Sequence, residues 1–391
     1  MRYQDETARR IVEHLWDRED ELLVFLKALV NRETPSADKP ANEEILLFLT
    51  EAYSDLGYIS KHLPGIQTGG VLYARPVERK KHQPTQLLIG HADTVWPMGT
   101  ITRMKVEDED GKVRGPGVYD MKAGLAQIYF ALKTLDALGL EASVLPLVLI
   151  NTDEEIGSFE SSRHIKRLSR VANRAYVLEP PLGTEGKLKT GRKGIGRFKI
   201  SVEGVAAHAG LDPDKGANAI VELSHLVQKL YAMNDPKRGI TVNVGTIEGG
   251  ISPNVVAPMS KAVIDVRVLS DEDGRFITNQ ILKLKAESDQ VKLTIEGGIG
   301  RPPMEKTDRN QKLWKVAREE GRRLGLDLKE ATAGGGSDAN TTSLYTATLD
   351  GLGTPGDGAH ASHEYILKNK LIERTALLSL LLLTAPKFAV S

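Results

Sequence analysis

Residues 144–157 read VLPLVLINTDEEIG, an apolar run that ends in three consecutive acids. A short apolar run of this kind is typical of a strand buried on both faces of a sheet. Three adjacent carboxylates after such a strand repel one another unless cations or shared protons relieve the repulsion. A surface loop could tolerate them, but the buried strand before them favours a functional site.

Apolar strands and helical patterns alternate on both sides of this stretch. Strands are predicted at 86–91, 145–151, 174–178 and 346–349. Helical patterns cover 11–30, 42–56, 121–138, 159–168, 310–324 and a buried C-terminal segment around 376–385. This alternation predicts an α/β sandwich around a mixed, largely buried sheet.

A different pattern occupies the middle of the chain. The expected order is strand 196–203, helix 216–233, strands 240–247 and 259–269, helix 271–286 and strand 291–296. This βαββαβ order is that of a ferredoxin-like unit. Because α/β alternation resumes after Arg301-Pro302-Pro303, we expect a domain at 193–304 inserted into a discontinuous domain made of 1–192 and 305–391.

The composition of the chain excludes several classes of partner and of active site. The 391 residues are 40% hydrophobic, enough for two domains. Because 52 basic residues balance 52 acidic ones, neither nucleic acid nor a membrane is an expected partner. The absence of cysteine excludes disulfides, thiolate nucleophiles and zinc sites that need sulfur. The N-terminus lacks an apolar signal segment, and 376–385 is about half of what a bilayer requires, so a cytoplasmic protein is expected.

Polar clusters follow several of the predicted strands, where open α/β sheets place their sites. His91 and Asp93 end the first strand, and their two-residue spacing lets Asp93 orient the imidazole of a ligand histidine. A hydrogen-bonded histidine that closes a strand is the simpler alternative. Asp120 lies in the Gly-rich turn GPGVYDMK and could instead be a helix N-cap.

The remaining clusters carry more acids and two histidines. Glu154 and Glu155 follow the strand quoted above, and Glu179 precedes two prolines, where it could be a solvated strand end. The loop GDGAHASHEY carries His360 and His363, either of which could be a helix cap.

Together these clusters supply a set of nitrogen and oxygen donors suited to zinc: His91, Asp120, Glu155, Glu179 and His360. One carboxylate that bridges two ions, with one histidine and one further carboxylate for each, would make a two-metal site with a shared water. Glu154 is then left over, and a carboxylate beside bound water is what a hydrolase needs as its general base.

At this point six motifs, in order along the chain, resemble those of one family: HADTV, GPGVYDMKAG, TDEEIGS, VLEP, GGGSDAN and GAHASHEY. The family is the M20-type dizinc metallopeptidases, which include glutamate carboxypeptidase, acetylornithine deacetylase, succinyl-diaminopimelate desuccinylase and aminoacylase. The resemblance spans the chain and is closest to the glutamate carboxypeptidase branch. It implies a co-catalytic dizinc hydrolase, two Zn²⁺ per subunit, with Co²⁺ or Mn²⁺ as substitutes.

The resemblance also implies residue roles. His91 and Glu179 match the ligands of one zinc, Glu155 and His360 those of the other, and Asp120 the bridging ligand. Asp93 matches the acid behind the ligand histidine, and Glu154 the general base. His360 is preferred to His363 because the family pattern is a histidine followed by a glutamate four residues later, here Glu364.

In the inserted domain, His208 resembles a histidine that the partner subunit lends to the active site, which implies a homodimer formed through that domain. Asn254 and Arg267 resemble residues that hold the substrate carboxylate. The basic residues at the domain junction, Lys187, Arg192 and Lys193, are expected to form a solvated face, although one of them could add charge to the carboxylate pocket.

The motifs depart from the usual pattern in two small ways. Ala123 follows Met121-Lys122 where relatives often have two glycines, and Gly336 stands where alanine or threonine is common. The triple glycine at 334–336 lacks phosphate-loop spacing, so we expect close backbone approach to the site there.

The function implied by the resemblance is hydrolysis of a peptide or N-acyl amide bond next to a free carboxylate, with release of an amino acid, for which glutamate is a candidate. The alternative is a catalytically silent amino-acid or peptide binding protein on the same fold, against which the intact ligand positions argue. A purely structural dimer would explain none of the acids at the strand ends.

Overall fold

The computed structural model describes residues 5–385, which form two compact units. The first unit consists of Met1–Thr190, Lys306–Thr332 and Ser337–Ser391 within these limits, and the second of Gly191–Glu305 and Ala333–Gly336. Each unit has its own hydrophobic core. The chain therefore folds as a discontinuous α/β unit with a second unit inserted into it.

The first unit is built on a mixed central sheet with the strand order β1-β2-β6-β3-β7-β14. Its strands are β1 (Tyr58–Leu63), β2 (Val71–Pro76), β3 (Thr85–His91), β6 (Leu145–Asn151), β7 (Arg174–Val177) and β14 (Ala347–Leu349). The pairings among β6, β3, β7 and β14 are parallel, whereas β1 and β2 form an antiparallel wing. Every residue of β6 is buried, as expected for a parallel strand covered on both faces.

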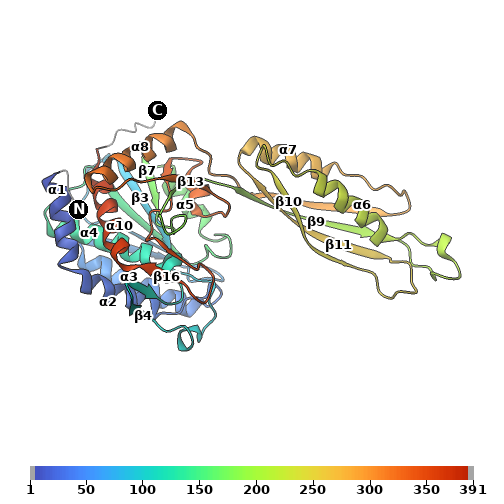
Figure 1. Cartoon of the computed structure of the whole chain (residues 1–391), viewed down its shortest axis with the longest axis horizontal. Coiled ribbons are helices and arrows are strands. Elements are labelled where there is room, and N and C mark those ends of the chain that lie inside the picture. Colours follow the sequence, from blue (N-terminus) through green and yellow to red (C-terminus); the bar gives the residue numbers. More distant parts are fainter. Residues whose placement is uncertain (1–4, 386–391) are drawn as a thin grey trace. The chain divides into compact units, whose positions relative to one another are not determined.

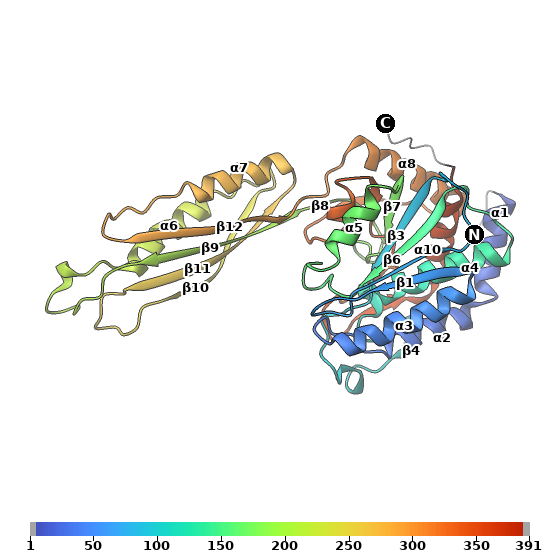
Figure 2. The same ribbon diagram turned by 180° about the vertical axis from the view of Figure 1, so that it is seen from behind.

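Helices cover both faces of this sheet (Figure 2). The helices of the unit are α1 (Glu6–Trp16), α2 (Glu19–Val30), α3 (Lys39–Asp55), α4 (Ala123–Ala137), α5 (Ser162–Ser169), α8 (Asp308–Arg323), α9 (Asp338–Thr342) and α10 (Lys368–Leu383). The main core joins α1–α4, α8 and α10 to alternate strand residues such as Leu88, Val148 and Tyr176. Intervening residues such as Leu87 and Leu147 are buried on the opposite face.

Smaller elements complete the first unit. A small sheet has the order β15-β16-β5-β4, and β8 pairs with β13. Their bounds are β4 (Glu107–Glu109), β5 (Lys112–Arg114), β8 (Leu188–Arg192), β13 (Glu330–Ala333), β15 (Gly356–Asp357) and β16 (Tyr365–Leu367), with short helical turns η1 (Thr100–Thr102) and η2 (Val118–Lys122).

The second unit has the strand order β10-β11-β9-β12 with antiparallel pairings throughout. Its elements are β9 (Gly194–Glu203), η3 (Pro213–Lys215), α6 (Ala219–Ala232), β10 (Thr241–Gly249), β11 (Met259–Val268), α7 (Asp271–Leu282) and β12 (Lys292–Arg301). Both helices lie on one face of the sheet, where alternate β9 residues such as Phe198 and Ile200 enter the core (Figure 1). This is the predicted ferredoxin-like arrangement.

The structure corrects several predicted elements. The helical pattern over 11–30 is two helices, because the chain turns at Asp17-Arg18. The strands β1 and β2 were not predicted. The C-terminal helix α10 is almost wholly buried. Among the described residues, every helix is too short or too polar to span a bilayer.

Candidate metal centre

Three strands of the central sheet end beside one another. His91 is the last residue of β3, Glu155 follows β6, and Glu179 follows β7. Because β3 pairs in parallel with both neighbours, the side chains after these strands meet at one edge of the sheet. Asp120 reaches the same edge from η2, directly before α4.

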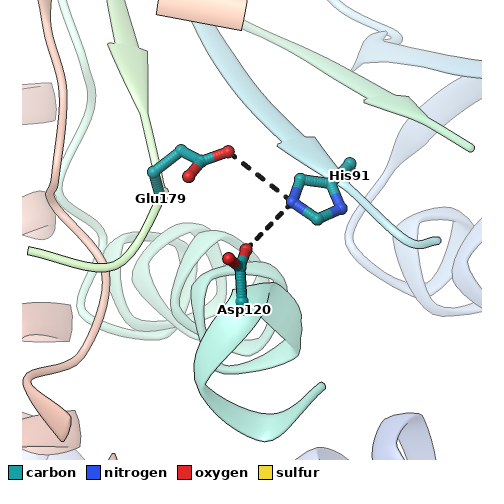
Figure 3. Close-up of side chains that lie close together, drawn as sticks. All are labelled: His91, Asp120 and Glu179. Carbon is teal, nitrogen blue, oxygen red and sulfur yellow. Dashed lines mark hydrogen bonds and ion pairs between the residues drawn. The ribbon is translucent and has the colours of Figure 1, made fainter. Parts of the chain in front are cut away.

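The first group of potential ligands is His91, Asp120 and Glu179 (Figure 3). The Nε2 atom of His91 lies 3.2 Å from Asp120 Oδ1 and 3.6 Å from Glu179 Oε1. His91 and Glu179 are buried, so Glu179 is not a solvated strand end. Asp120 is not the N-cap of α4 either, because that helix begins at Ala123 after Lys122.

The second group is Asp120, Glu155 and His360. The Nε2 atom of His360 lies 3.2 Å from Glu155 Oε2 and 3.7 Å from Asp120 Oδ2. Its imidazole is 52% exposed, so this side of the cluster is open to solvent. His363 does not belong to either group.

The two groups share Asp120, which turns Oδ1 toward His91 and Oδ2 toward His360. Each group therefore has one histidine, one carboxylate of its own and one oxygen of the shared carboxylate. The buried Oε1 of Glu155 has no hydrogen-bond partner, which is expensive for a carboxylate unless a cation occupies the space. The residues present therefore fit a pair of divalent ions with nitrogen and oxygen ligands.

The charges of the cluster favour a cation. A hydrogen bond to Glu155 raises the pKa of His360 to about 9, and burial raises the pKa of Glu155 above its usual value. Burial opposes a charge on His91, but hydrogen bonds to Asp120, Asp93 and Glu179 raise its pKa well above the ordinary range. The positive charges of the two protonated histidines thus offset the negative charges of the carboxylates. Bound metal ions would take over that role.

Asp93 is placed behind this cluster and is completely buried. The Nδ1–H of His91 donates to the backbone carbonyl of Asp93 at 2.9 Å, so Nε2 carries the free lone pair in the neutral ring. The Asp93 carboxylate accepts from the backbone N–H groups of Glu154 and Glu155 at 3.2 Å and from Ser36 Oγ at 2.7 Å. Asp93 therefore orients the histidine through its backbone carbonyl and through Oδ1, which lies 3.4 Å from Nδ1, and its carboxylate also holds the acidic segment.

Glu154 precedes the potential ligand Glu155, is half-buried, and donates its backbone N–H to Asp93. It belongs to neither group of potential ligands. Its role as general base therefore stays a prediction that is compatible with its position beside the cluster.

Glu364 is a functional residue whose role the sequence analysis missed. Its Oε1 accepts from the N–H groups of Tyr119 and Asp120, at 2.9 and 3.0 Å. Its Oε2 accepts from Gly117 N and Trp96 Nε1, both at 2.8 Å. This buried carboxylate anchors the turn that presents Asp120. The Gly-rich turn GPGVYD, whose N–H groups need acceptors, is the signal that could have indicated it.

The residues predicted for the substrate carboxylate and for the shared histidine all lie in the second unit. His208 is exposed, and its Nδ1 accepts from the N–H groups of Gly210 and Leu211, at 3.1 and 3.2 Å. The proton of the neutral ring is therefore on Nε2. Asn254 is close by, since its carbonyl accepts from Ala209 N at 3.0 Å.

Arg267 lies on β11 beside Asp265. Its Nε and Nη2 atoms donate to the two Asp265 oxygens at 2.7 and 3.1 Å, a bidentate pair within the strand. Any substrate carboxylate at Arg267 would therefore meet a guanidinium that Asp265 already orients.

One expectation about the junction is wrong. Arg192 is buried, not solvated, and donates to the carbonyls of Gly335 and Gly336 at 3.2 and 3.0 Å. A Cβ at Gly334 or Gly335 would meet open space, so no other part of the described chain packs closely against the backbone there. Only at Gly336 would a Cβ clash, and the atoms it would meet belong to Arg301 and Ile195 of the second unit.

The chain is similar in sequence to known peptidases. Residues 87–384 match the model of the peptidase family M20/M25/M40. Carboxypeptidase G2 of Pseudomonas sp. (strain RS-16) is 30% identical over 365 residues, which cover 90% of this chain and 86% of that protein. The uncharacterized protein YqjE of Bacillus subtilis (strain 168) is 25% identical over 84% of this chain and 90% of its own length.

Solved structures show the same fold. The aminopeptidase PepT from Bacillus cereus ATCC 10987 superposes with a TM-score of 0.80 at 22% identity, over 93% of this chain and 98% of that one. The metallo-carboxypeptidase Sso-CP2 from Sulfolobus solfataricus gives a TM-score of 0.73 at 18% identity, over 93% of this chain and 99% of that one.

Proposed function

The chain belongs to the peptidase family M20/M25/M40 and is a metallopeptidase-type hydrolase, and we propose that it is a dizinc exopeptidase or aminoacylase that releases an amino acid with a free carboxylate. The observation that carries the proposal is the shared carboxylate of Asp120, one oxygen of which faces each histidine. The relative that is named a carboxypeptidase supports cleavage at a carboxyl terminus.

In this proposal His91, Glu179 and Asp120 hold one Zn²⁺, and Glu155, His360 and Asp120 hold the other. When bound, such ions supply Lewis acidity, which polarises a carbonyl and lowers the pKa of water. Asp93 and Glu364 keep His91 and Asp120 in place. The open side of the cluster at His360 is where substrate would enter.

Glu154 takes the proton of the attacking water and delivers it to the leaving amine, which is the work of a general base that then acts as an acid. His208 of a partner subunit donates Nε2–H to the oxyanion of the tetrahedral intermediate. The hydrogen bonds at its Nδ1 support this role, because they leave the proton on the outward nitrogen. Asn254 and Arg267 hold the carboxylate of the amino acid that leaves.

Metal analysis of the purified protein, followed by a hydrolysis panel, tests the proposal. The panel contains peptides that end in glutamate, aromatic or basic residues, together with N-acetyl, N-succinyl and longer N-acyl amino acids. We expect two ions per chain and hydrolysis of at least one class, with glutamate as the first residue to test. A protein without bound metal and without turnover of any compound would instead be the binding protein of the alternative hypothesis.

A further inference from the structure

The acidic segment 152–157, here called the acid loop, carries Glu154 and Glu155 from the end of β6 toward α5. Its middle is fixed by Asp93, which accepts from the N–H groups of both glutamates. A loop of this length also needs fixed ends if its side chains are to keep their direction. The residues at its two ends are Asn151 and Ser158, both buried.

One carboxylate, that of Asp338, contacts both ends. Asp338 Oδ2 accepts from Asn151 Nδ2 at 2.6 Å, and Oδ1 accepts from Ser158 Oγ at 2.5 Å. The three side chains are at most 2% exposed. Hydrogen bonds to an ionised carboxylate are roughly twice as strong as neutral ones, and burial strengthens them further.

Both ends of the acid loop need this support. Ser158 has a left-handed backbone, with φ at 57°, which is unfavourable for a residue other than glycine. At the other end, the carbonyl of Asn151 accepts from Ala92 N at 2.8 Å, directly after His91. Asp338 thus ties the far end of the acid loop to the strand end that lies beside His91.

We propose that Asp338 is a positioning residue of the active site, which clamps Asn151 to Ser158 and so sets the direction of Glu154 and Glu155. The proposal rests on the proposed function, in which these two glutamates are the general base and a metal ligand. It also gives a role to the GGGSDAN motif, which places Asp338 at the start of α9, where Ser337 caps the helix.

The first test compares Ser158→Ala with Thr346→Val. Both changes remove one hydroxyl from a buried side chain: Ser158 Oγ donates to Asp338, whereas Thr346 Oγ1 donates to the Ala172 carbonyl at 2.8 Å, outside the acid loop. Thr346→Val is therefore the control for loss of a buried hydrogen bond. Loss of a residue that supports metal ligands lowers activity or metal affinity by about 10- to 100-fold.

We expect Ser158→Ala to lower kcat by about tenfold or more with KM nearly unchanged, because the acid loop carries the proposed base and a potential metal ligand but not the residues proposed to hold the substrate carboxylate. Co²⁺ titrated into the metal-free protein, followed by visible absorption, should bind at its weaker site about tenfold less tightly. Thr346→Val should change neither quantity, although both variants should unfold at a lower temperature than the unmodified protein.

A second pair of variants tests Asp338 itself. Asp338→Asn keeps an acceptor for Ser158, and its amide can donate to Asn151 Oδ1, which is buried without a hydrogen-bond partner, once the Asn151 amide turns over. Asp338→Ala removes both contacts. Asp338→Asn should therefore retain much more of the kcat and of the Co²⁺ affinity than Asp338→Ala.

The clamp is overturned if Ser158→Ala and Thr346→Val have the same kcat and the same Co²⁺ affinity while the unmodified enzyme is active. It is also overturned if Asp338→Ala, folded by circular dichroism, matches Asp338→Asn in both measurements. An unmodified protein that binds no Co²⁺ and cleaves no compound of the panel overturns the proposed function, and the clamp with it.

Discussion

The candidate site residues of the two units differ in how they are held. In the first unit the potential ligands are mostly buried, and three buried carboxylates from distant parts of the chain, Asp93, Glu364 and Asp338, fix the segments that carry them. In the second unit His208 and Asn254 are exposed and are held by contacts with neighbouring loop residues. The metal cluster is therefore preorganised by its own unit, whereas among the described residues no buried carboxylate supports His208 or Asn254.

Asp120→Asn tests the preorganised region most severely. The amide keeps the size of the side chain but loses its charge and one of the two oxygens that face the histidines, so both ions should bind more than about 100-fold less tightly. Hydrolysis should fall to the background rate. Metal stoichiometry and Co²⁺ titration measure the effect.

Asp110→Asn, in an exposed turn after β4, is the matched control and should retain both ions. Two tightly bound ions in Asp120→Asn would mean that Asp120 is not shared between them.

Glu154→Gln should separate catalysis from metal binding. Because Glu154 belongs to neither group of ligands, metal content should stay nearly unchanged while kcat falls by about 10²- to 10⁴-fold. Glu155→Gln is the natural comparison, since it should lose metal as well as activity. The opposite pattern would show that the two glutamates have exchanged roles.

Most residues of the metal cluster could be predicted from the sequence because they end or follow buried strands, which short stretches of sequence identify. Buried apolar strands stop at His91, before Glu155 and before Glu179, and parallel strands of one sheet end on the same edge. The motif resemblance then selected His360 over its neighbour His363. The α/β class and the βαββαβ unit were predicted for a similar reason, since both depend on periodicity along short segments.

The roles of the supporting carboxylates could not be predicted in the same way. Asp338 and Glu364 lie far along the chain from the segments that they hold, and no spacing rule connects an acid to N–H groups 244 to 247 residues away. The strand β1 was missed because it lies at the sheet edge with a largely exposed surface, which leaves little apolar pattern to detect.

His208→Ala tests the exposed region. If a partner subunit contributes this residue, the variant should bind metal and substrate almost normally but lose about 10²- to 10³-fold in kcat, as for removal of one oxyanion donor. His225→Ala, another histidine of the second unit that is paired with Glu287, is the control.

Mixing Glu154→Ala with His208→Ala makes the test decisive. A mixed dimer contains one site with an intact Glu154 and an intact His208 from the partner subunit, so activity should recover after subunit exchange. Recovery would not occur if His208 acts within its own chain, provided that exchange is confirmed independently.

The pH dependence of metal binding should sharpen the description of the first unit. The pKa of His360 is raised to about 9 in the metal-free protein, so below that pH a metal ion must displace a proton from the ring. The apparent Co²⁺ affinity of the group with Glu155 should therefore rise by about tenfold per pH unit between pH 6 and 8. His360→Ala should weaken binding and flatten this slope, and a slope near zero in the unmodified protein would contradict the assignment.

The smallest effects are expected at the pair of Arg267 and Asp265. The pair is partly exposed, so its loss should change the free energy of unfolding by only about 0.2–1 kcal/mol. Asp265 orients the guanidinium but would also repel a substrate carboxylate bound there. Asp265→Asn, which keeps an acceptor and removes the charge, should therefore lower KM a few-fold for substrates with a free carboxylate, and Arg267→Lys should raise it about tenfold because the planar bidentate partner is lost. Neither change should alter KM for the corresponding C-terminal amides. Equal turnover of acid and amide by the unmodified enzyme would remove Arg267 from carboxylate recognition.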